Sequence, residues 1–139
     1  MRRGIALFCV VVTLLCLVGC QKKQTYGVYE VIITETLIAN HSVGNEWQIT
    51  YTCDGKAIVS GEQRTAPLDE VQTLTIDATV TEVDKLPDTG QGALAVILKD
   101  GFSTSTVVTI TENKGCYYGQ EAEWEITCEV KLLQEFVIE

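Results

Sequence analysis

The sequence predicts an all-β protein, folded as an antiparallel β-sandwich of about seven to eight strands. Three observations predict this class: apolar residues alternate with polar ones at period two, threonine and β-branched residues are abundant, and short turn signals separate the alternating segments. Strands at such short spacing are typical of two packed antiparallel sheets. The length of 139 residues and the 46% apolar content fit one domain with its own core.

The alternation is clearest over residues 121–132, where Trp124 and Cys128 belong to an apolar face and glutamates occupy the other. Residues 47–53 and 74–81 repeat the pattern, with threonine as the main polar residue. Each of these strands is expected to cover a core on one side. Further strands are predicted at residues 28–38, 92–98 and 105–111, with a weaker one at residues 57–63.

Clusters of Asn, Asp, Gly and Pro separate these segments and predict turns. They lie at residues 40–45, 54–55, 87–90, 100–101 and 113–115. A single helical turn is predicted at residues 67–71. Residues 132–139 keep their apolar residues but lose the alternation, so they either extend the last strand or cross an edge of a sheet.

The chain begins with the pattern of an export signal. Arg2 and Arg3 precede an apolar run over residues 5–18, which only Thr13 interrupts. A run of about fourteen residues is too short for a membrane-spanning helix of about twenty, but it has the length of a signal-peptide core. Residues 1–19 are therefore predicted to be a cleaved signal peptide.

The end of this segment, Leu17-Val18-Gly19-Cys20, resembles the lipobox of bacterial lipoproteins. The resemblance implies that diacylglycerol is transferred to the Cys20 thiol, that the chain is cleaved after Gly19, and that the new amino terminus is usually acylated. Two or more acyl chains anchor a protein stably to a bilayer that it does not span. Cys20 and a tether through residue 25 would then hold a sandwich domain of residues 26–139 on the cell membrane, facing the periplasm or the exterior.

The net negative charge of the chain limits the classes of partner that it is expected to bind. Its 10 Lys and Arg against 19 Asp and Glu give a net charge of −9, and removal of residues 1–19 leaves 8 against 19, or −11. Nucleic-acid binding needs a basic patch and is not expected. Anionic headgroups repel such a body, and only Lys22 and Lys23 beside the anchor favour the lipid surface. The expected partners are the membrane, through Cys20, and a protein or small ligand of the cell envelope.

Three cysteines follow the lipidation site: Cys53, Cys116 and Cys128. An exported compartment permits disulfides, and an odd count leaves at least one thiol unpaired in a monomer. The alternation places Cys53 and Cys128 on core-facing sides, which favours an inter-sheet bridge between them if their strands face each other. A Cys116–Cys128 pair and three buried thiols are the alternatives.

No catalytic set is recognisable in the sequence. It lacks a nucleophile elbow, a phosphate-binding glycine loop and zinc-ligand spacing. His41, the only histidine, lies in a polar turn and is interpreted as an ordinary surface residue. Most carboxylates occupy outward strand positions, which are usually solvated. The chain is therefore predicted not to be an enzyme.

Two turns are rich in oxygen-bearing side chains. Glu82, Asp84 and Asp88 lie in one connection, and Asn40 and Glu46 lie in another. Calcium takes six to eight oxygen ligands, so acids gathered in one turn suit it. Ordinary acidic turns on an acidic protein are the alternative.

Together these segments resemble the calcium-dependent phospholipid-binding C-two domains, which are eight-stranded sandwiches with metal loops at one end. In that family a late loop carries a pair of acids, then a third acid and a glycine. The resemblance implies that Glu82 and Asp84 fill the first pair, Asp88 the third acid and Gly90 the glycine. Asn40 and Glu46 would correspond to the acids of the family's first loop, which precedes the strand that starts here at Trp47. Two of these positions depart from the usual Asp, and the spacing is shorter. An immunoglobulin-like sandwich is the other arrangement that the strand pattern allows.

The expected function is that of a membrane-anchored, non-enzymatic binding module of the cell envelope, with calcium as its candidate cofactor. Sandwich domains usually bind through the loops at their ends. Tyr117 and Tyr118, between two glycines, form a candidate binding loop because tyrosine supplies contact area and a hydroxyl, although both could fold back over the core. The alternative is a small envelope inhibitor or accessory subunit of an enzyme or transport complex, which would insert the turn at residues 115–119 into its partner.

Overall fold

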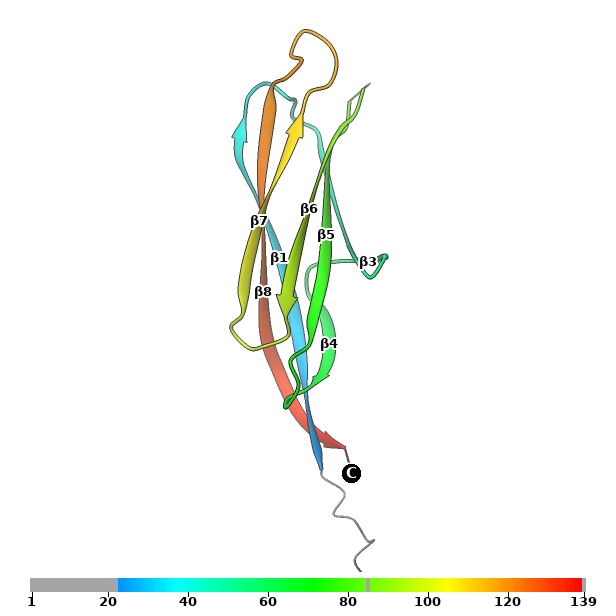
Figure 1. Ribbon diagram of the computed structural model, residues 1–139, viewed down its shortest axis with the longest axis vertical. Helices are drawn as coiled ribbons and strands as arrows, with labels where there is room; N and C mark the ends of the chain where they lie inside the picture. Colours follow the sequence, from blue (N-terminus) through cyan, green and yellow to red (C-terminus); the bar gives the residue numbers. More distant parts are fainter. Residues whose placement is uncertain (1–22, 85, 139) are drawn as a thin grey trace, which may run out of the picture.

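A computed structural model describes residues 23–84 and 86–138 and shows eight strands in two antiparallel four-stranded sheets (Figure 1). The predicted all-β sandwich is confirmed, and the described ranges contain no helix. The predicted signal peptide, the lipidation site Cys20 and the first part of the tether lie outside the described residues.

The two sheets have the strand orders β4-β1-β8-β7 and β3-β2-β5-β6. An immunoglobulin sandwich pairs its first strand with the second and its third with the sixth, so only the two-sheet architecture is shared with it. In chain order the strands are β1 (Gln24–Asn40), β2 (Trp47–Cys53), β3 (Lys56–Ile58), β4 (Glu62–Pro67), β5 (Thr73–Glu82), β6 (Asp88–Ile97), β7 (Ser103–Thr111) and β8 (Glu121–Ile138).

Three local predictions are wrong. The turn predicted at residues 87–90 is strand from Asp88 onward, because β6 begins there. The segment predicted as one weak strand at residues 57–63 is divided between β3 and β4, which belong to different sheets. The chain passes from one sheet to the other through Gly61, whose φ of 88° favours glycine and whose N–H donates to the Val31 carbonyl at 2.8 Å. The helical turn predicted at residues 67–71 is absent, because β4 continues to Pro67 and residues 68–70 form a turn.

The core lies between the sheets and is built from the inward positions of the alternating strands. Each fully buried Ile or Val side chain contributes about 1.5–3 kcal/mol relative to exposure. The neighbouring outward positions carry mainly Thr and Glu, as the alternation predicts. The largest fully buried side chains are Val31, Ile76, Val80, Val96, Val108, Ile110, Ile126 and Cys128.

The sheets approach most closely where β6 passes β7. A β-carbon at Gly90 would overlap the carbonyl oxygen of Thr109 and lie 3.0 Å from Val108 Cγ1. A β-carbon at Gly92 would lie 2.8 Å from Val108 Cγ2. Glycine at these two positions therefore lets the two edge strands meet and close one side of the sandwich.

The last strand is longer than its alternation suggests. β8 pairs with β1 from Ile138 opposite Gln24 to Ala122 opposite Asn40, so residues 132–138 extend the strand, one of the two expected outcomes. The register shifts because Val28 faces Gln134 while Tyr29 faces Leu132, which leaves Leu133 as an extra residue. This β-bulge explains why the alternation is lost at that point.

The sandwich is elongated, and its ends differ (Figure 1). One end, here called the terminal end, carries the first described residues, 23–25, and the last, 136–138. The opposite end, the distal end, carries the three connections at residues 41–46, 83–87 and 112–120. Everything that the sequence predicts as a site beyond Cys20 and the cysteines lies at the distal end.

Candidate functional site

Three carboxylates are buried directly beneath the distal loops. Glu82 ends β5 and faces Asp88, the first residue of β6, while Glu112 follows β7. The Glu82 side chain is only 3% exposed, and its Oε2 has no hydrogen-bond partner among the residues that the structure describes. Two of the acids that the sequence singles out, Glu82 and Asp88, are thus brought together, and Glu112 joins them.

The environment of Glu82 opposes its ionisation. Burial is the main cause of its raised pKa, and the carboxylates of Asp84, Glu112 and Asp88 raise it further. A hydrogen bond from the backbone of Glu46 opposes this rise only in part. The side chain also fills the space below Gly44, where a β-carbon would overlap Glu82 Oε1 and where φ is 136°. A proton on Glu82 is therefore stabilised in the folded protein.

Asp88 holds the base of the 112–120 loop. Its Oδ1 accepts hydrogen bonds from the Asn113 backbone N–H at 3.1 Å and from Asn113 Nδ2 at 2.9 Å. The loop is also closed by two backbone bonds of 2.9 Å, from the Glu112 N–H to the Gln120 carbonyl and from the Gly119 N–H to the Glu112 carbonyl. The base of the loop is thus fixed, and Asp88 acts as a structural acceptor.

The other predicted metal ligands brace their own turns. Asn40 Nδ2 donates to the Gly44 carbonyl at 2.7 Å, and Asn40 Oδ1 accepts from the Val43 N–H at 3.0 Å. Asp84 Oδ1 accepts from the Leu86 N–H at 2.6 Å. Glu46 is exposed. These contacts are those of capped turns.

The donors do not form the shell that the C-two resemblance implies. A calcium site gathers six to eight oxygens around one point. Over residues 23–84 and 86–138, no three or more His, Cys, Asp or Glu side chains are grouped so that they could hold a metal ion. The oxygens that accept from Val43, Leu86 and Asn113 are already engaged in holding the loops. We therefore derive no step through calcium.

The tyrosine pair forms the exposed tip of the 112–120 loop. Tyr117 is 56% and Tyr118 is 75% exposed, so neither folds back over the core. Gly115 and Gly119, with φ of 89° and 81°, turn the chain on either side of the pair. Both rings are therefore presented to solvent at the distal end.

A shallow hollow separates this loop from the neighbouring one. Its volume is about 300 Å³. Val83 and Leu86 are exposed in the neighbouring loop, so aliphatic side chains lie at the same end as the two tyrosines. The residues that line the hollow are Leu86, Pro87, Asp88, Asn113 and Lys114.

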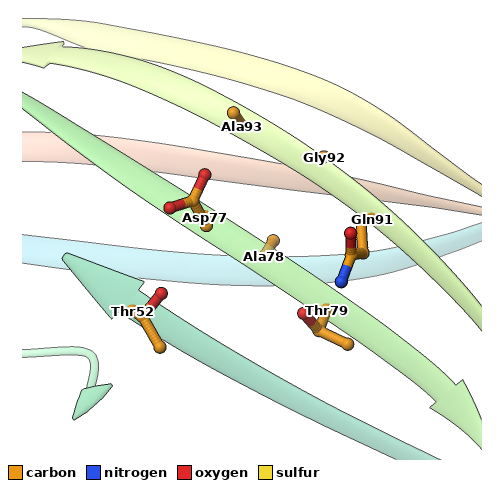
Figure 2. Close-up of a pocket in the computed structure, with 7 residues that line it drawn as sticks. All are labelled: Thr52, Asp77, Ala78, Thr79, Gln91, Gly92 and Ala93. Carbon is orange, nitrogen blue, oxygen red and sulfur yellow. The ribbon is translucent and has the colours of Figure 1, made fainter. Parts of the chain in front are cut away.

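A second hollow, which no local sequence pattern predicts, lies on the outer face of β2, β5 and β6 (Figure 2). Its volume is about 510 Å³, and small side chains create it. Asp77 is the only charged residue in its lining, and no aromatic ring lines it, whereas ligand pockets are mostly apolar and aromatic. The distal end is therefore the better candidate surface. The lining consists of Thr52, Asp77, Ala78, Thr79, Gln91, Gly92 and Ala93.

Cys53, Cys116 and Cys128 are free thiols in this structure. Cys53 and Cys128 both face the core, as the alternation predicts, and they lie in opposite sheets, as an inter-sheet bridge would require. Burial raises the pKa of both thiols, that of Cys128 to about 11, so neither is activated as a nucleophile. Cys116 is exposed in the 112–120 loop.

No protein-family model, curated protein or solved structure matches the chain. Within the part of the chain that the structure describes, no helix has the length and apolar character needed to cross a membrane. The geometry of the two ends of the sandwich is therefore the basis for the function proposed below.

Proposed function

We propose that the protein is a lipid-anchored lipoprotein of the bacterial cell envelope, which binds a protein partner through its distal end and catalyses no reaction. One observation carries the proposal: the chain enters the sandwich at the terminal end, a few residues after Cys20, and the tyrosine loop lies at the opposite end (Figure 1). A lipid on Cys20 would place this loop on the side of the molecule that faces away from the bilayer.

The dimensions of the fold suit this role. The four residue-to-residue steps from Cys20 to Gln24 span at most about 14 Å, so the terminal end stays near the membrane. β1 has 17 residues and rises about 3.3 Å per residue, which carries the distal loops about 55 Å away from Gln24. The long β1–β8 pair acts as a stalk that separates the anchor from the contact surface.

The chemistry of the distal end favours a protein partner. Tyrosine is enriched at protein interfaces because it offers a large contact area with little loss of side-chain entropy. Tyr117 and Tyr118 are exposed, and Leu86 adds aliphatic surface nearby. The exposed acids Glu46 and Asp84 belong to the same end and would favour a basic surface on the partner. These features support binding by contact, without calcium.

The proposal is tested by crosslinking in the cell envelope. A photoreactive residue at position 118 of the full chain should give one discrete crosslinked species, because that side chain protrudes from the distal end. The same group at Thr75, which is exposed on the outer face of β5, is the matched control and should give none. Tyr117→Ala should weaken the crosslink from position 118 by about tenfold or more, equivalent to about 1.4 kcal/mol of contact energy.

Two results would contradict the proposed surface. One is an equal yield of the same species from positions 118 and 75, which would indicate contact without preference for the distal end. The other is a strong crosslink that Tyr117→Ala leaves unchanged, because the tyrosine pair would then contribute nothing to binding.

A further inference from the structure

The terminal end carries an apolar segment that the sandwich does not cover. The last six described residues of β8, at positions 133–138, are all exposed. Successive residues of a strand point to opposite faces, so the run of Phe136, Val137 and Ile138 makes both faces of this ribbon apolar. Val137 is 49% and Ile138 is 54% exposed. A strand that faces water on one side would carry polar residues on that side.

The segment is ordered by its pairing and does not hang free. Gln24 pairs with Ile138 and Thr25 with Val137, and the Tyr26 and Phe136 rings stack with centroids 5.7 Å apart. The Leu68 N–H donates to the Thr25 carbonyl at 2.9 Å, which brings the β4–β5 turn to the same place. These contacts hold a defined apolar surface, here called the terminal patch. It consists of Leu68, Leu133, Phe136, Val137 and Ile138.

We propose that the terminal patch inserts into the headgroup layer of a bilayer of neutral, zwitterionic lipids, the bilayer to which the lipid on Cys20 attaches. The inference rests on the proposed function, because it requires that anchor. The protein would then stand on the membrane in one orientation, with its distal end outward. A tether alone would leave the body free to rotate.

The position of the terminal patch, close to Cys20, indicates that the bilayer is what contacts it. The four residue-to-residue steps from Cys20 to Gln24 reach at most about 14 Å, and the patch begins at the strand pair that contains Gln24. A headgroup layer is about 5–7 Å thick, so the patch lies within reach of the upper acyl chains. Tyrosine rings such as that of Tyr26 favour this layer, and the Phe136 ring stacks on it. Attachment also raises the local lipid concentration, so weak insertion suffices.

The charges beside the patch select the type of lipid. Lys23, Asp69 and Glu135 line a hollow with Leu68 and Thr25 at the same end. The two carboxylates outnumber the one ammonium group, and the chain without residues 1–19 carries a net charge of −11. Anionic headgroups would therefore repel the protein, whereas a neutral headgroup layer would not. The patch is therefore suited to a zwitterionic surface and binds by its apolar side chains.

The test is made on the full chain, produced with its lipid and reconstituted in phosphatidylcholine vesicles. Phe136→Trp places an indole in the patch, and Val137→Trp places one on the other face of the ribbon. We expect lipid brominated in the upper acyl chain to quench both indoles. Tyr118→Trp, at the distal end, is the control and should keep its emission. The parent protein supplies the background from Trp47 and Trp124, which pack edge to face within the sandwich.

The outcomes separate the inference from the proposed function. The mass of the amino-terminal peptide is measured on the same sample. If Cys20 carries lipid and both patch indoles remain unquenched, the inference is wrong and the proposed anchor stands. An emission shift that depends on protein concentration, without quenching, would show that the patch joins two copies, which also overturns it. If Cys20 carries no lipid, both proposals fail.

Discussion

Gly90→Ala is expected to lower the free energy of unfolding by about 2–3 kcal/mol. The added methyl group would overlap the Thr109 carbonyl oxygen, a backbone atom that cannot rotate away. The strands β6 and β7 would have to separate, and this would open the side of the sandwich that glycine closes. Chemical denaturation followed by circular dichroism measures the loss.

Gly92→Ala is the matched control on the same strand. A β-carbon there meets a Val108 methyl group at 2.8 Å, and a side chain can yield where a backbone cannot. We expect a loss of about 1 kcal/mol, the lower part of the range for overpacked sites. Equal stability of Gly90→Ala and the wild type would show that β6 and β7 do not approach as closely as described.

Glu82→Gln is expected to stabilise the protein by about 1–3 kcal/mol at neutral pH, because it removes a buried carboxylate whose Oε2 lacks a partner among the described residues. The pKa of Glu82 is raised in the folded protein above its ordinary value of 4.5. The folded state therefore holds this proton more tightly than the unfolded state does. The resulting stability is complete below pH 4.5 and is lost as the pH rises through the folded pKa.

The measurement is the difference in unfolding free energy between Glu82→Gln and the wild type from about pH 4 to pH 8. This difference should grow with pH as the wild type loses its proton. Glu121→Gln alters an exposed carboxylate at the start of β8 and should leave the pH dependence unchanged. A difference that is constant with pH, or that shrinks as the pH rises, would contradict the claim that the folded protein disfavours the charged form of Glu82.

The fold class was largely predictable, because the alternation of apolar and polar residues along a strand indicates directly which side chains are buried. Ile126 and Cys128 are fully buried, as their alternation with Glu125 and Glu129 requires. The pairing of the strands could not be predicted in the same way, because it depends on contacts between residues that are distant in sequence. The segment 57–63 divides because Gln63 pairs with Glu30 on β1, a partner that no local pattern reveals. Alternation likewise places Cys53 and Cys128 on the core face, but it cannot show which residue of the opposite sheet each one contacts.

The candidate site was predictable in location but not in chemistry. The acid-rich turns do lie at one end, yet Asp88 accepts from Asn113, which is 25 positions away. Only the folded chain shows that this carboxylate is engaged in holding the loop. The need for Gly90 is likewise set by Thr109 on another strand. The bulge at Leu133, by contrast, had a local signal, because the alternation stops there.

The most direct test of a lipid-anchored binding module is the mass of its amino-terminal peptide, measured on protein extracted with detergent from bacterial membranes. We expect a peptide that begins at Cys20, with diacylglycerol on the thiol and, in most cells, an acyl group on the new amino terminus. A chain that still begins at Met1, or one in which Cys20 is unmodified, would contradict the anchor and with it the orientation of the tyrosine loop.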